Sequence, residues 1–224
     1  MSNKTRPLLI ILLLLSIIWV VDFVTDITQR VTFLDSDVEL AVRERINKTE
    51  GPILHSELQG TAVFWVQGLN ITDLGGLECC TNLEILVLPE NHISDISPLA
   101  SLTKLRTLAL WGNQISDISP LASLNNLSRL HLMSNQINDI SPLASLDKLY
   151  SLVLSENQIS DISALASHKA LTNLYLQDNR ITDISKLTSL PELKTLDLRQ
   201  NPLDSASINT FIPQLEQRGI KVRW

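Results

Sequence analysis

A period of 22 residues runs through most of the chain and limits what it can fold into. Asparagine recurs at this interval, at Asn91, Asn113, Asn135, Asn157, Asn179 and Asn201. Each asparagine follows a frame of the form L-x-x-L-x-L-x-x-N, in which apolar residues return at fixed offsets. Units of this length bury their apolar edges only against their neighbours in a stack. The sequence therefore predicts one elongated array of stacked units.

The last two leucines of each frame alternate with other residues, which is the period of a strand with one buried face. Stacked units would align these strands as a parallel sheet. A 22-residue period leaves room for only a short return segment, and Ser97-Pro98 and its equivalents are typical of a cap before a helical turn. We therefore expect an α/β solenoid with a parallel concave sheet, short 3₁₀ or α turns on the convex side, and helical caps at both ends.

Two polar columns accompany the leucines. The asparagine amide both donates and accepts hydrogen bonds, so that a column of asparagines can satisfy buried backbone groups in the turns. An aspartate column runs in register with it, at Asp73, Asp95, Asp117, Asp139, Asp161 and Asp183. Aligned carboxylates also suit a calcium ladder, but aspartate beside a turn commonly accepts from nearby backbone N–H groups. We interpret both columns as structural and predict no metal site.

The N-terminus carries a membrane-targeting pattern. Lys4 and Arg6 precede residues 8–21, which are strongly apolar except for Ser16. A helix of that length would span about 21 Å, short of the roughly 30 Å hydrocarbon core, which favours a signal peptide. No Ala-x-Ala-like cleavage site follows, which favours an uncleaved anchor. We expect residues 1–30 to be an anchor or signal segment with a linker, and the basic flank to stay in the cytoplasm.

Residues 31–60 are predicted to cap the start of the array. Ser36 and Glu39 match a capping box at the start of a helix, and a second short helix is expected near 55–58. Residues 61–203 comprise one decayed repeat followed by six fuller ones.

Residues 204–224 are predicted to form a C-terminal cap made of a helix and a short strand. Ser205 or Ser207 is the candidate cap of its helix, and Pro213 is expected to distort or shorten that helix.

Two residues break the leucine pattern at the same position of the repeat. Cys80 stands in a column that leucine otherwise fills, and we expect it to pack as a small apolar side chain. His168 stands in the same column, where we expect a partly exposed, tolerated histidine. Neither residue has partners at metal-ligand spacing.

Charge and motif content argue against several functions. The formal net charge is -6, and the acidic and basic residues of the array are interspersed without a basic stripe, so we predict no nucleic-acid partner. We find no arrangement of nucleophile, base and orienting residue, and no glycine-rich phosphate loop. The sequence predicts no catalytic residues and no cofactor.

The pattern L-x-x-L-x-L-x-x-N-x-I-x-D-I-S-P-L-A-x-L covers about Thr61 to Leu203. It resembles the 22-residue leucine-rich repeats of bacterial internalin-like surface proteins and of related phosphatase-regulatory repeats. The flanking sequences GPILHSEL and INTFIPQLEQRGIKV also resemble the flanks of bacterial leucine-rich repeat proteins. The chain departs from internalins in having no cell-wall sorting motif and no room for an immunoglobulin-like domain. The resemblance implies a protein-binding scaffold.

The binding residues are predicted from the strand positions that face away from the core. Aromatic residues, methionine and arginine are enriched at binding hot spots. The chain has four tryptophans, two tyrosines and four phenylalanines, and three of these ten aromatics fall on the predicted concave face. The predicted partner-binding residues are Trp65, Val87, Trp111, Arg129, His131, Met133, Tyr175 and Arg199.

These observations predict a non-enzymatic interaction scaffold that binds a protein or peptide ligand on its concave face. We expect it to be displayed outside the cytoplasmic membrane and held there through residues 8–21. Two alternatives remain open: an intracellular subunit resembling a phosphatase regulator, and a secreted adhesion or ligand-binding protein after signal cleavage.

Overall fold

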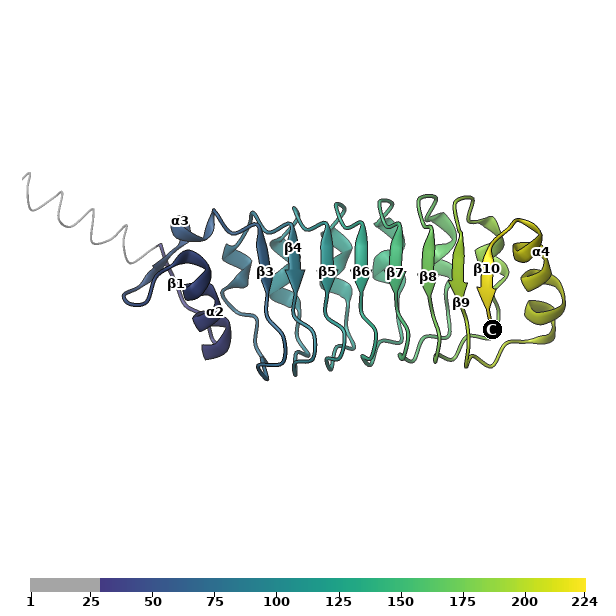
Figure 1. Ribbon diagram of the computed structural model, residues 1–224, viewed down its shortest axis with the longest axis horizontal. Coiled ribbons are helices and arrows are strands. Elements are labelled where there is room, and N and C mark those ends of the chain that lie inside the picture. The colour runs from purple at the N-terminus through teal and green to yellow at the C-terminus, as the bar shows by residue number, and fades with distance from the viewer. Residues whose placement is uncertain (1–28) are drawn as a thin grey trace, which may run out of the picture.

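The computed structural model describes residues 29–224, which form one elongated solenoid (Figure 1). An eight-stranded parallel sheet runs along it in the order β10-β9-β8-β7-β6-β5-β4-β3. Its strands are β3 (Val63–Trp65), β4 (Ile85–Val87), β5 (Thr107–Ala109), β6 (Arg129–His131), β7 (Ser151–Val153), β8 (Asn173–Tyr175), β9 (Thr195–Asp197) and β10 (Lys221–Arg223). The predicted leucine-rich repeat solenoid is confirmed. The sheet exceeds the six fuller repeats because the decayed repeat and the C-terminal strand extend it.

The predicted membrane segment, residues 8–21, lies outside the described residues. Within residues 29–224, no helix is both long enough and apolar enough to cross a bilayer.

Six of the seven repeats return from the sheet through a short 3₁₀ turn, as predicted, and the last one leads into the C-terminal cap. The turns are Leu77–Cys79, Ser97–Ser101, Ser119–Ser123, Ser141–Ser145, Ser163–Ser167 and Ser185–Ser189. The strand register places Leu108 between Leu86 and Leu130, and this stacking of like residues recurs along the sheet. The buried leucines and isoleucines of all the repeats therefore form one continuous core.

The turns start in a different way from the one predicted. The Oδ1 atom of Asp95 accepts a hydrogen bond from the backbone N–H of Ser97 at 2.8 Å, and its Oδ2 atom accepts from the Ser97 hydroxyl at 3.0 Å. The expectation that serine caps the turn is therefore wrong, since Ser97 is the first residue of the turn and Pro98 the second. A carboxylate is the stronger acceptor, and it takes both donors of the serine.

The N-terminal cap consists of helix α2 (Ser36–Ile46), helix α3 (His55–Leu58) and a small antiparallel pair of strands, β1 (Arg30–Val31) and β2 (Ile53–Leu54). The cap of α2 is Asp35 rather than the predicted Ser36, because Asp35 Oδ1 accepts from the N–H groups of Asp37 and Val38 at 2.9 and 3.3 Å. Helix α3 begins and ends where the sequence predicted it.

The C-terminal cap becomes helical at Ser205, widens into a π-helical turn, Ser207–Phe211, and continues as helix α4 (Ile212–Gln217) before β10. The cap is Asp204, which accepts from Ser207 N–H at 2.7 Å, so the predicted serine caps are wrong. The Ser207 hydroxyl is buried and donates to the Thr182 carbonyl at 2.9 Å instead. Pro213 has no N–H to donate to the preceding turn, which agrees with the widened backbone before it.

The two unusual residues of the leucine column are both fully buried. This confirms the prediction for Cys80, and burial is the main cause that raises the pKa of its thiol to about 12. The expectation of a partly exposed His168 is wrong. Its Nε2 atom lies 3.1 Å from the Leu143 carbonyl oxygen of the preceding repeat, so an imidazole fills the leucine position with one hydrogen bond.

Candidate functional site

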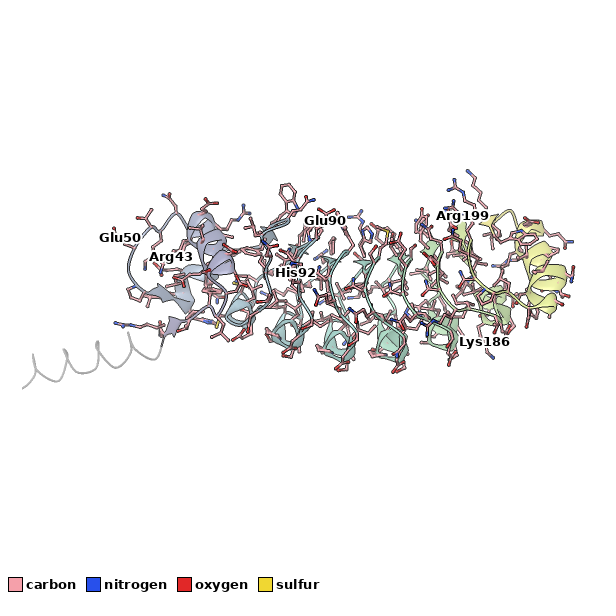
Figure 2. The ribbon with its side chains drawn as sticks, turned by 90° about the horizontal axis from the view of Figure 1, so that it is seen from below. Arg43, Glu50, Glu90, His92, Lys186 and Arg199 are labelled. Carbon is pink, nitrogen blue, oxygen red and sulfur yellow. The ribbon has the colours of Figure 1, made fainter. Side chains whose placement is uncertain are left out.

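The candidate site is the face of the sheet that points away from the core, called here the sheet face. Figure 2 shows Arg199 on this side of the solenoid and Lys186 on the opposite side, among the 3₁₀ turns. The strand register aligns one outward column across the sheet: Trp65, Val87, Ala109, His131, Val153, Tyr175 and Asp197. The second outward column, just beyond the strand ends, includes Trp111, Met133, Ser155, Gln177 and Arg199.

Trp111, His131 and Met133 form what we call the central cluster. The ring centroids of Trp111 and His131 lie 6.1 Å apart, with a tilt of 33° between the rings. Met133 stands next to Trp111, because the N–H of Gly112 donates to the Met133 carbonyl oxygen at 2.9 Å. All three side chains are half-buried. The structure therefore brings together three of the predicted binding residues.

Unpartnered polar atoms lie in this part of the sheet face. Within residues 29–224, His131 Nε2 and Ser155 Oγ are buried and have no hydrogen-bond partner. Burial lowers the pKa of His131, so its ring is neutral near pH 7. Reasoning from the sequence missed Ser155, because serine recurs through the chain in the 3₁₀ turns and nothing distinguishes this one.

Arg129 stands beside the central cluster at the start of β6 and is exposed. Its guanidinium carbon lies 5.1 Å from the centroid of the Tyr150 ring, in a cation–π arrangement. Tyr150 was not among the predicted residues, because it precedes its strand and the outward alternation does not include it. Val87 and Tyr175 are half-buried in the outward column on either side of the central cluster.

Arg199 is held by a neighbour within the chain. Its Nη2 atom lies 2.6 Å from Oδ2 of Asp197, and its Nε atom donates to Oδ1 at 2.9 Å. Asp197 is almost fully buried, and Arg223 lies 4.0 Å from the same carboxylate. Burial alone would raise the pKa of Asp197, but the hydrogen bonds from Arg199 and the two positive charges together lower it. Arg199 is thus a binding candidate that also compensates a buried charge.

Trp65 lies apart from the central cluster, at the N-terminal end of the sheet. It is 66% exposed, the most exposed tryptophan of the described chain. It lines a groove of about 600 Å³ together with Leu40 and Ala41 of α2 and with Leu69. Trp65 and Arg199 therefore lie toward opposite ends of the sheet, on either side of the central cluster.

Among residues 29–224, no three histidine, cysteine, aspartate or glutamate side chains are arranged to share a metal ion.

Comparison with known proteins places this geometry among repeat proteins. The family model described as Leucine Rich repeats (2 copies) matches residues 81–123, 125–167 and 169–211. An internalin (inlF) of Listeria monocytogenes is 33% identical with a TM-score of 0.78, and the match covers 85% of this chain and 55% of that one. The chain therefore spans about half the length of that internalin.

Internalin C2 of the same organism is also 33% identical, with a TM-score of 0.62, and 81% of this chain and 93% of that one are covered. A leucine-rich repeat protein of Leptospira interrogans shares the fold at 24% identity and a TM-score of 0.63, over 69% of this chain and 40% of its own. No curated protein sequence matches the chain.

Proposed function

The chain belongs to the internalin-like leucine-rich repeat family, and from this premise we propose that it is a non-enzymatic scaffold that binds a protein or peptide on its sheet face. The observation that carries the proposal is the central cluster. Trp111 and Met133 expose part of their apolar surface beside a half-buried His131, and none of the three belongs to the continuous core.

The surroundings of the cluster fit a hot spot for a protein partner. Binding energy at interfaces concentrates in a few aromatic, methionine and arginine side chains ringed by less important contacts. Trp111 and Met133 supply the apolar centre, and Arg129 supplies a charge at its margin. Small or uncharged neighbours, such as Ala109 and Val153, leave the centre accessible from the sheet side.

We assign the scaffold to the outer side of the cytoplasmic membrane. The support is the sequence of residues 1–21, in which Lys4 and Arg6 precede the apolar run. Cell fractionation combined with protease treatment of intact cells tests this assignment. Repeats that are digested from outside and sediment with membranes agree with it, release into the medium indicates the secreted alternative, and full protection in the cytoplasm contradicts both.

A capture experiment tests the central cluster. The full chain, the variant Trp111→Ala/Met133→Ala and the control Trp224→Ala/Leu34→Ala are each used to capture surface proteins of candidate target cells. The control removes comparable apolar side chains that are exposed elsewhere, 56% for Trp224 and 72% for Leu34. We expect the cluster variant to bind its captured partner about tenfold more weakly, with unchanged thermal stability. If all three chains bound the captured partner equally well, the proposal would be wrong.

A further inference from the structure

Strand β3 forms the N-terminal edge of the sheet, with a paired side and an open side. On the paired side, the Ala62 carbonyl accepts from Ile85 N–H at 3.1 Å, and Val66 N–H donates to the Val87 carbonyl at 2.9 Å. Backbone groups alternate between the two sides of a strand, so the N–H and C=O groups of Val63 and Trp65 point away from β4. Because β3 pairs with β4 alone, these four groups have no backbone hydrogen-bond partner within residues 29–224.

A groove runs along this open edge. Helix α2 lies beside β3, as Figure 1 shows at the purple end of the solenoid, and the space between them is the groove of about 600 Å³. Leu40, Trp65 and Leu69 line it and are 57%, 66% and 40% exposed. They are three of the five large apolar residues that are exposed in residues 29–224. Solvent-exposed apolar surface is thus concentrated where backbone groups are unpaired.

We propose that an extended peptide binds in this groove by adding a strand to the open edge of β3. An extended peptide supplies both things that the groove lacks: N–H and C=O groups for Val63 and Trp65, and apolar side chains against the walls. Its side chains alternate between the two faces of the new strand. One set packs beside Val63 and Trp65, and the other beside Ala41 and Val66.

The charged side chains that line the groove indicate which kind of peptide it binds. The groove is also lined by Asp37, Glu44 and Arg45, and none of these three has an ion-pair partner in the part of the chain that the structure describes. Carboxylates outnumber the guanidinium, so the bound peptide carries a basic residue next to its apolar ones.

A second copy of the chain does not fit the groove. Its β3 edge is flanked by its own α2, and its other edge strand, β10, is packed against α4. Two such edges would approach to the inter-strand distance of about 4.8 Å only if the flanking helices moved. A free peptide segment carries no flanking helix.

Selection from a displayed library of random nine-residue peptides on the full chain tests the proposal. Selected peptides are synthesised with single N-methyl groups at successive positions, since each N-methyl group removes one backbone donor. We expect binding to be lost at every second position. We also expect amide hydrogen exchange at Val63 and Trp65 to slow when the peptide is bound.

Substitutions in the groove and elsewhere test where the peptide binds. Trp65→Ala and Ala41→Arg change opposite walls of the groove, and each should weaken peptide binding about tenfold. Trp224→Ala, which removes another exposed tryptophan, and Trp111→Ala/Met133→Ala, in the central cluster, should leave it unchanged. Failure to enrich any peptide, N-methyl effects without a period of two, or full binding by both groove variants would overturn the inference without affecting the proposal for the central cluster.

Discussion

The Oδ1 atom of Asn135 accepts a hydrogen bond from the backbone N–H of Ile115 at 3.0 Å, so that one repeat closes the turn of the repeat before it. The Nδ2 atom of the same amide donates to the carbonyl oxygens of Leu110 and Leu132 at 3.0 and 3.1 Å. One side chain therefore satisfies buried backbone groups of two neighbouring repeats. The same relationship recurs at Asn113 and Asn157.

Replacement of Asn135 by alanine is expected to destabilise the array. The substitution leaves a buried backbone N–H and two carbonyl groups without this partner, at about 1–3 kcal/mol for each group that water cannot reach. Urea unfolding followed by circular dichroism measures the loss. The exposed Asn138→Ala is the control and should change the free energy of unfolding by less than about 0.5 kcal/mol. Equal stability of the two variants would contradict the structural role of the column.

Replacement of His168 by leucine is expected to stabilise the chain in acid. Burial is the main cause that lowers the pKa of His168 in the folded chain, so the unfolded chain binds more protons once the pH falls below about 6.5. Stability is therefore lost as pH falls from about 6.5 toward the folded pKa, by at most about 1.4 kcal/mol per pH unit for this one group.

The measurement is urea unfolding at a series of pH values between about 7 and 5, roughly the range in which an unperturbed histidine titrates. His168→Leu should make the dependence less steep, and the part that remains includes His131, whose pKa burial also lowers. An unchanged slope in His168→Leu would show that the buried ring does not cause it.

Replacement of Arg199 by alanine is expected to cost folding stability. Arg199 donates to both carboxylate oxygens of the buried Asp197, and a hydrogen bond to a charged group contributes about 1.5–3 kcal/mol. Because the pKa of Asp197 is lowered in the folded chain, the contribution is present above its unfolded pKa and is lost as the pH falls through the folded value. Denaturation of Arg199→Ala at neutral pH, with exposed Arg180→Ala as the control, should show the loss in the first variant alone.

The two adjacent cysteines are expected to differ in reactivity. Burial and the neighbouring acidic groups raise the pKa of Cys80 to about 12, so almost no thiolate forms near pH 8, and the side chain has no exposed surface. Cys79 is half-buried, and burial raises the pKa of its thiol as well. A thiol-reactive dye should label the folded Cys79→Ser variant only after denaturant is added. Rapid labelling of that variant in buffer would contradict the packing of this repeat.

Reasoning from the sequence identified the solenoid and the asparagine column, and it placed Trp111 and Met133 on the outward side, because each depends on the repeat itself. In a stack with a constant register, a contact between two repeats recurs in the next pair, so that Leu86, Leu108 and Leu130 must meet. The alternation along each strand then places Trp111 and Met133 on the side away from the core. The spacing of residues along the sequence thereby determines which residues are neighbours in the folded structure.

The tertiary structure determined the features that the 22-residue pattern does not specify. Whether aspartate or serine caps a helix depends on which side chain reaches the free N–H groups, as at Asp35 and Asp204. The burial of His168 depends on the Leu143 carbonyl oxygen that lies next to its ring. The groove at Trp65 exists because α2 meets the sheet where no repeat precedes β3. The repeated pattern determines the contacts inside the stack, because each contact between two repeats recurs in the next pair. Contacts made by the caps, or by residues that depart from the pattern, do not recur. They therefore depend on how these particular segments and side chains pack.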